Sequence, residues 1–120
     1  MKSIWITGAS SGIGKSLALK FAKEGWQVAA SARREDLLNQ LCQSNENITS
    51  FPLDVTNKEK CEKTFEKIKN TYEKLNMCFF STGTWDPKKE KDIDVEQIED
   101  VFKVNFFGTV NTIKVVEQYF

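Results

Sequence analysis

The stretch ITGASSGIGKS, residues 6–16, decides the fold, because it joins a predicted strand to a predicted helix through a glycine-rich turn. Two phosphate-binding devices share this pattern. Gly8, Gly12 and Gly14 favour a turn that binds the pyrophosphate of a dinucleotide, since glycines permit a tight turn and close approach of the phosphate. Residues 9–16 also follow A-x-x-x-x-G-K-S, a relaxed P-loop. In that alternative Lys15 would reach the β- and γ-phosphates of a nucleoside triphosphate and Ser16 the magnesium ion.

Predicted strands and helices alternate along the rest of the chain. Such alternation is typical of crossover units and a parallel sheet. Right-handed crossovers then favour an α/β, Rossmann-type, doubly wound sheet of four strands in the order 3-2-1-4. Pro52 cannot donate a ladder hydrogen bond, which places the third strand at an edge, as this order requires. The expected strands are 2–7, 26–32, 48–53 and 77–82, and the expected helices are 13–24, 34–43, 56–72 and 94–120, with a loop at 83–93.

Composition excludes several classes of function. Lysine plus arginine and aspartate plus glutamate number 17 each, so the net charge of zero gives no support for a nucleic-acid or membrane partner. No apolar run approaches the roughly 20 residues that span a bilayer, and the first residues do not resemble a signal peptide. Three widely spaced cysteines fit buried, reduced thiols in a cytoplasmic protein. The absence of histidine excludes a Ser-His-Asp triad and a histidine metal site, and no metal site is expected.

Two arginines follow the second predicted strand and indicate which dinucleotide is bound. In an NAD site an acidic residue at this place holds the ribose 2′-hydroxyl, whereas in an NADP site an arginine nearby holds the 2′-phosphate. The strand here ends at Ala32, and Arg33 and Arg34 come 19 and 20 residues after Gly14. Arginine–phosphate contacts would favour NADP over NAD by roughly ten- to a hundredfold. We therefore expect NADP, with a solvated arginine pair as the alternative and NAD as the less favoured cofactor.

The segment TGASSGIG (residues 7–14) resembles the T-G-x-x-x-G-x-G motif of the short-chain dehydrogenase/reductase family. LDVT (53–56), STGT (81–84) and VNFFGTVNTI (104–113) resemble further motifs of that family in the same order. The resemblance implies an NADP-dependent oxidoreductase that transfers a hydride between nicotinamide and a small carbonyl or alcohol substrate. Together with the residues discussed above, it gives the expected cofactor-binding set Gly8, Ser10, Ser11, Gly12, Ile13, Gly14, Arg33, Arg34, Asp54, Val55, Ser81 and Gly83.

The motif after the third strand implies that Asp54 contacts the adenine. Capping of the following helix, shared with Thr56, is the alternative for this side chain. STGT departs from the family's N-N-A-G pattern at Ser81 and Thr82, where asparagine and alanine are usual, while Gly83 is retained. These departures leave open how the end of the fourth strand is braced.

The resemblance implies a catalytic role for Asn105, which in the family kinks its helix and anchors a water of the proton relay. In this chain Asn105 falls on an apolar stripe of the last helix, where an unsatisfied polar side chain would cost about 1–3 kcal/mol. An asparagine bonded inside the core is therefore the alternative. The residues of this stripe are Ile98, Val101, Phe102, Phe106, Thr109 and Ile113.

The family's catalytic serine and its Y-x-x-x-K pair have no counterpart here. Tyr72 is followed four residues later by Asn76, and Tyr119 by only one residue. We expect residues 1–120 to be an incomplete NADP-binding Rossmann domain, truncated after the helix that follows the fourth strand and not catalytically competent alone. A non-catalytic NADP-binding sensor and a P-loop NTPase remain alternatives. The family commonly assembles through the last helix, so the resemblance is compatible with a homo-oligomer.

Overall fold

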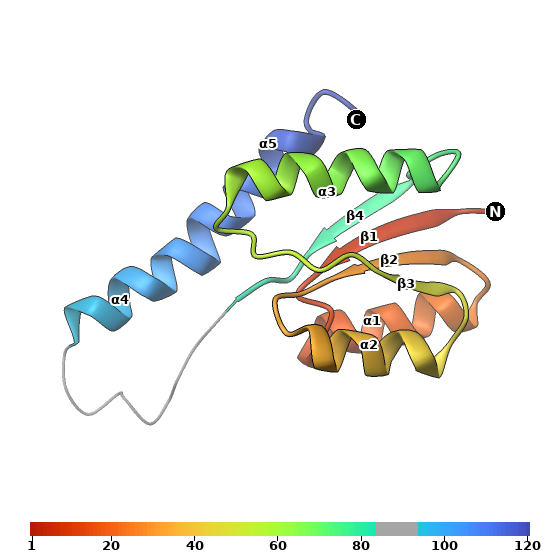
Figure 1. Cartoon of the computed structure of the whole chain (residues 1–120), viewed down its shortest axis with the longest axis horizontal. Coiled ribbons are helices and arrows are strands. Elements are labelled where there is room, and N and C mark those ends of the chain that lie inside the picture. The colour runs from red at the N-terminus through yellow and green to blue at the C-terminus, as the bar shows by residue number, and fades with distance from the viewer. Residues whose placement is uncertain (84–93) are drawn as a thin grey trace.

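A computed structural model describes residues 1–83 and 94–120; the predicted loop therefore lies outside the described residues, apart from Gly83. One parallel sheet has the strand order β3-β2-β1-β4. This confirms the predicted doubly wound topology (Figure 1). The strands are β1 (Ser3–Thr7), β2 (Gln27–Ser31), β3 (Ile48–Ser50) and β4 (Met77–Phe80).

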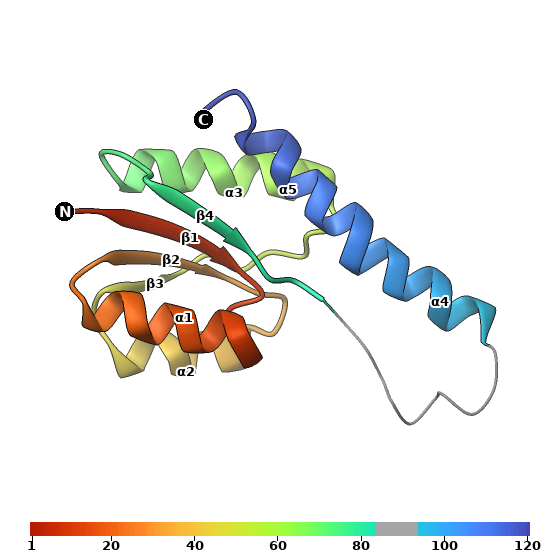
Figure 2. The ribbon, with the colours of Figure 1, turned by 180° about the vertical axis from the view of Figure 1, so that it is seen from behind.

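Helices cover both faces of the sheet, as the views from the front and from behind show (Figures 1 and 2). Helices α1 (Gly12–Lys23) and α2 (Glu35–Ser44) pack on one face, over Ile4 and Ile6 of β1. Helices α3 (Lys58–Thr71) and α5 (Thr109–Val116) pack on the other, where the buried Trp5 ring stacks on Phe65 at 5.9 Å between centroids. Alternate residues of β1 therefore face opposite layers, as a strand with a period of two requires.

The edge strand β3 is shorter than predicted, because regular pairing ends at Ser50. The main chain nevertheless continues along β2: the amide of Phe51 donates to the carbonyl of Ala30 (2.9 Å) and that of Leu53 to the carbonyl of Ala32 (3.1 Å). Pro52 lies between these two donors and is exposed. It occupies a position whose amide would face away from the sheet, which is why an edge strand tolerates it.

The start of α3 differs from the prediction by one position. Asn57, not Thr56, is the N-cap, and its side chain accepts a hydrogen bond from the amide of Lys60 (3.0 Å). Thr56 has the spacing of a capping box with Glu59, but its hydroxyl is engaged elsewhere, with Asp54. Asparagine caps helices as well as threonine does, so the sequence pattern alone could not distinguish the two.

The last helical segment begins, as predicted, at the N-cap Asp94, whose carboxylate accepts a hydrogen bond from the amide of Gln97 (3.2 Å). It is not one uniform helix. Helix α4 (Val95–Phe102) passes into a π-helical segment, η2 (Lys103–Gly108), and then into α5. Such a widened turn often lies at a functional site, and this one contains Asn105.

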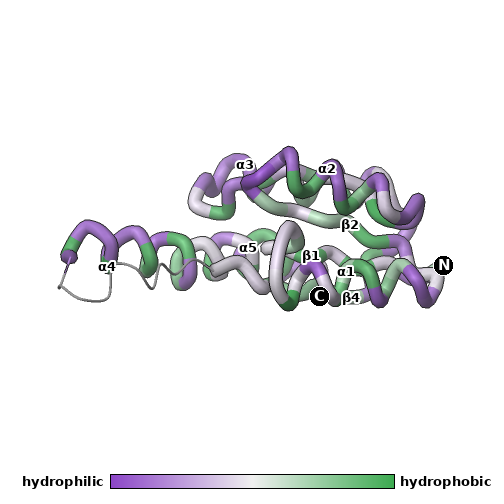
Figure 3. The backbone as a smooth tube through the Cα atoms, turned by 90° about the horizontal axis from the view of Figure 1, so that it is seen from below, coloured by the Kyte–Doolittle hydropathy of each residue, from purple (hydrophilic) through white to green (hydrophobic). Residues whose placement is uncertain are grey.

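The apolar stripe predicted for this helix is not its buried face. Phe102 and Phe106 are 59% and 56% exposed, and Asn105 beside them is also exposed. The physical reason is the direction of α4, which projects beyond the ends of the strands (Figures 1 and 3). The buried face is instead a short row in η2 and α5 that consists of Gly108, Thr112 and Val116.

All three cysteines are free thiols, but only Cys61 is fully buried, while Cys42 and Cys78 are half-buried. Burial raises the pKa of Cys61 to about 11 and that of Cys78 to about 12. Both thiols are therefore overwhelmingly protonated at neutral pH, and protonated thiols are poor nucleophiles. Among the helices within the described residues, none is both long enough and apolar enough to span a membrane.

Candidate functional site

A cavity of about 340 Å³ lies at the carboxyl ends of the strands, where the winding direction switches between β1 and β4. Open α/β sheets bind ligands at this position. All twelve residues of the predicted binding set line the cavity, although they come from four separate segments of the chain. Its lining also includes five residues outside the predicted binding set: Ser31, Ala32, Leu53, Thr82 and Val104.

The glycine turn forms the wall of this cavity next to α1. Gly8 and Gly12 have φ of +66° and +57°, in the left-handed region that favours glycine. Ser11 is the N-cap of α1, but its side chain makes no capping bond within the described chain, and the first turn contains no acidic residue. The amides at the start of α1 are thus left for an anion, and the helix dipole favours one there.

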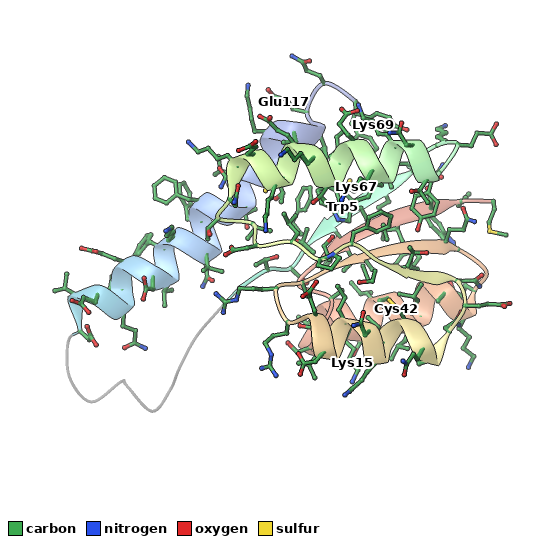
Figure 4. All side chains as sticks on the ribbon, in the orientation of Figure 1. Trp5, Lys15, Cys42, Lys67, Lys69 and Glu117 are labelled. Atoms are coloured by element: carbon green, nitrogen blue, oxygen red, sulfur yellow. The ribbon has the colours of Figure 1, made fainter. Side chains whose placement is uncertain are left out.

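Ile13 and Lys15, in the first turn of α1, lie in different surroundings. The Ile13 side chain belongs to the predicted binding set, is 71% exposed and lines the cavity. The buried residues of this helix are Gly14, Ala18 and Ala22. Lys15 does not line the cavity; it is exposed beside a groove between α1 and α2, and its side chain lies at the surface in Figure 4.

Ser81 braces the end of β4 against β1. Its hydroxyl donates to the carbonyl oxygen of Thr7 at 2.8 Å, and its amide reaches the same oxygen at 3.3 Å. A Cβ added to Gly14 would lie 2.5 Å from the Ser81 hydroxyl oxygen, so the small side chain fits tightly beneath the glycine turn. Serine therefore supplies a brace at the position where the family pattern has asparagine.

Replacing Ser81 with alanine should lower the free energy of unfolding by about 1 kcal/mol, because one partly buried hydrogen bond to Thr7 is lost. Urea denaturation followed by circular dichroism would measure the change. Ser11→Ala is the matched control, since the exposed Ser11 side chain makes no capping bond. Equal stability of Ser81→Ala and the unaltered chain would show that the hydroxyl does not brace the strand.

The two arginines expected to bind the 2′-phosphate, Arg33 and Arg34, have different surroundings. Arg34 is held by Asp36: its Nε and Nη2 atoms approach the two carboxylate oxygens at 3.3 Å and 3.2 Å. No ion pair or hydrogen bond engages Arg33 within residues 1–83 and 94–120. Both side chains are exposed and line the cavity. Arg33 is therefore the arginine available to a bound anion without breaking an existing contact.

Asp54 faces the cavity on the side of the β3–α3 loop. It does not cap α3. One of its carboxylate oxygens, Oδ1, accepts two hydrogen bonds from Thr56, from the hydroxyl at 2.7 Å and from the amide at 3.0 Å. These bonds hold the pKa of the Asp54 carboxyl below its usual value, and the nearby charges of Arg33 and Lys103 act in the same direction. The carboxylate is therefore ionised at neutral pH and can act only as a hydrogen-bond acceptor.

Asn105 lies on η2, close to Gly83 after the end of β4. A Cβ added to Gly83 would lie 3.5 Å from the side-chain oxygen of Asn105, so the helix approaches the end of β4 closely here. Val104, its neighbour, lines the cavity, whereas Asn105 itself does not. The buried Gly108 permits a close approach to Val55 on the β3–α3 loop, because an added Cβ would meet the Val55 side chain at 2.5 Å. The π-helical segment thus lies close to two of the segments that line the cavity, the β3–α3 loop and the residues after β4.

The sequence profile described as short chain dehydrogenase matches residues 2–120 of this chain. A match over nearly the whole chain, together with the fold and the motifs above, shows that the chain belongs to the short-chain dehydrogenase family.

Particular relatives cover this chain almost completely but extend well beyond it. The NADPH-dependent 1-acyldihydroxyacetone phosphate reductase of Schizosaccharomyces pombe is 32% identical over 115 residues, which are 94% of this chain and 38% of the reductase. The 11-beta-hydroxysteroid dehydrogenase-like 3 protein of Arabidopsis thaliana is also 32% identical, over 90% of this chain and 37% of that protein. Among solved structures, ElxO with NADP bound is similar with a TM-score of 0.83 and 27% identity, over 98% of this chain and 50% of ElxO. The chain spans half or less of the length of each of these proteins.

Proposed function

We propose that this chain binds NADP(H) in the cavity at the switch point of the sheet, as the cofactor-binding part of an oxidoreductase. One observation carries the proposal: the glycine turn, the two arginines, the Asp54–Val55 segment and the Ser81–Gly83 segment all line a single cavity. A P-loop would account only for the first of these segments. A relative described as NADPH-dependent and a structural neighbour with NADP bound support the choice of cofactor.

Each part of the cavity has a proposed partner in the dinucleotide. The amides at the start of α1 bind the pyrophosphate, as helix N-termini do in this architecture. Arg33 binds the 2′-phosphate, which favours NADP over NAD. Asp54 and Val55 contact the adenine. Ser81 and Gly83, at the end of β4, lie toward the nicotinamide ribose.

For the whole protein we propose the reaction of the family, hydride transfer between the nicotinamide and a small carbonyl or alcohol substrate. The cofactor supplies or accepts the hydride, and the residues of this chain hold and orient it. Asn105 is proposed to anchor a water of the proton relay from the widened turn η2. Since these 120 residues contain no Y-x-x-x-K pair, we propose that the chain binds the cofactor without turning over substrate by itself.

Calorimetric titration of the chain tests the proposed function. NADPH should bind with a Kd below about 100 μM, within the range usual for enzyme ligands, and MgATP should bind more weakly. Both ligands contain adenosine 5′-diphosphate. They differ in the 2′-phosphate and nicotinamide ribose of NADPH and in the γ-phosphate and magnesium ion of MgATP. Tighter binding of MgATP than of NADPH would instead favour the P-loop alternative.

A further inference from the structure

The carbonyl of Val55, on the β3–α3 loop, accepts a hydrogen bond from a residue far along the chain. The donor is the side-chain amide of Asn111 on α5, whose Nδ2 atom lies 2.9 Å from the carbonyl oxygen. Val55 is buried and lines the cavity. The thiol of Cys61 approaches the same oxygen at 3.5 Å, but a thiol is a weak donor. Asn111 therefore supplies the stronger bond to this wall of the cavity.

The loop has few other attachments to the rest of the molecule. Before it, the amide of Leu53 is bonded to β2. Among the described residues, the other hydrogen bonds of residues 54–56 come from within residues 54–61. Such local bonds shape the turn, but they do not set its distance from a neighbouring layer. The hydrogen bond from Asn111 joins the loop to the helix that packs beside it.

Gly108 and Asn111 approach the same residue, because positions three apart lie on one face of a helix. A Cβ added to Gly108 would meet the Val55 side chain at 2.5 Å, so the missing side chain lets the helix and the loop come close enough for the Asn111 bond. Three residues before Gly108, Asn105 lies close to Gly83 after the end of β4. The loop is therefore held by the same helical segment that adjoins the end of β4.

We propose that Asn111 is a positioning residue of the cofactor site, which holds Val55 so that the loop wall of the cavity is in place before a dinucleotide enters. A wall that is ordered in the free chain spares the ligand the cost of ordering it. This inference rests on the proposed NADP(H) function and names a residue outside the cavity lining on which the affinity depends. Because Asp54 and Val55 are proposed to contact the adenine, the effect should fall on the adenosine half of the dinucleotide.

The test measures the binding of NADPH by fluorescence and of adenosine 2′,5′-bisphosphate by calorimetry. Asn111→Ala should weaken both by about three- to tenfold, as expected for one hydrogen bond between neutral groups. Asn47→Ala is the matched control. The Asn47 side-chain amide also donates to a backbone carbonyl, that of Ala22 at 3.1 Å, but it precedes β3 and lies at the amino ends of the strands, away from the cavity. Asn47→Ala should lower the urea midpoint by a similar amount and change both affinities by less than about twofold.

Three outcomes would overturn this inference and leave the proposed function standing. The first is an unchanged affinity for both ligands in Asn111→Ala. The second is an equal loss in Asn47→Ala, because the loss would then follow from lower stability in general. The third is a loss for NADPH alone, or an unaltered chain that binds NADPH but not the bisphosphate, because the effect would then lie outside the adenosine half.

Asn111→Leu keeps the approximate size of the side chain and has no donor. It makes the same comparison if Asn111→Ala does not fold, as judged by circular dichroism. A folded, unaltered chain that binds neither ligand would refute the proposed function together with this inference.

Discussion

Alanine at Gly14 should abolish NADPH binding and lower the free energy of unfolding by about 3 kcal/mol or more. The added Cβ would lie 2.2 Å from the carbonyl oxygen of Gly8 and 2.5 Å from the hydroxyl of Ser81. The first neighbour is backbone and cannot rotate away, so either the turn or the start of α1 must move. Overpacking of a tight interior carries a cost of this size. Urea denaturation and fluorescence titration with NADPH would measure the two effects.

Gly12→Ala is the matched control for this prediction. No atom lies within 4 Å of a Cβ added there, so its cost comes from the positive φ of +57° alone, about 1 kcal/mol. The stability of Gly12→Ala should therefore lie between those of the unaltered chain and of Gly14→Ala. If Gly14→Ala proved as stable as Gly12→Ala, the result would contradict the close contact between the glycine turn and α1.

Replacing Arg33 with alanine should weaken NADPH binding by roughly ten- to a hundredfold while changing the affinity for NADH by less than about threefold. The 2′-phosphate is the group that distinguishes the two cofactors, and a charge-assisted arginine–phosphate contact is worth this much. Parallel titrations of NADPH and NADH give the ratio directly. The prediction concerns the ratio of the NADPH and NADH affinities. A variant that is only less stable would lose affinity for both cofactors and would not change this ratio.

Arg34→Ala provides the comparison, since Arg34 lines the same cavity but is already paired with Asp36. That pair is exposed and contributes little to stability, yet it holds the guanidinium away from a new partner. The change in the NADPH/NADH ratio should therefore be smaller for Arg34→Ala than for Arg33→Ala. If the ratio of the NADPH and NADH affinities were the same in both variants and in the unaltered chain, neither arginine would select between the two cofactors.

The strand order could be predicted from the sequence because it depends on rules that act along the chain. Alternating elements and right-handed crossovers limit the topology, and Pro52 identifies the edge. The buried face of the last helix could not be predicted in this way. Phe102, Phe106 and Ile113 form the stronger apolar pattern, yet the helix packs through Gly108 and Thr112. Which face is covered depends on the direction in which α4 leaves the sheet, and the spacing of apolar residues contains no information on that direction.

The binding set was similarly predictable where short motifs determine it, and all twelve of its residues line one cavity. Residues that join the lining through the register of the sheet were missed. Ser31 is an ordinary residue at the end of β2, and its pairing with Thr7 of β1 brings it to the cavity. The sequence pattern predicts Thr56 to be a helix cap, because threonine is common in that role. Its bond to Asp54 depends on loop geometry that no motif specifies.

The glycine turn, Arg33 and Asp54 are proposed to bind one NADP(H) molecule together. Two-dimensional amide NMR of the isotopically labelled chain, titrated with NADP⁺, tests it most directly. We predict that the largest chemical-shift changes fall on Gly8, Gly12, Gly14, Arg33 and Asp54. A separate groove between α3 and α5 is lined by Glu66, Lys69 and Lys114 among others, and its amides should not change. Saturable changes confined to that groove, or none in the folded chain at millimolar NADP⁺, would contradict the claim.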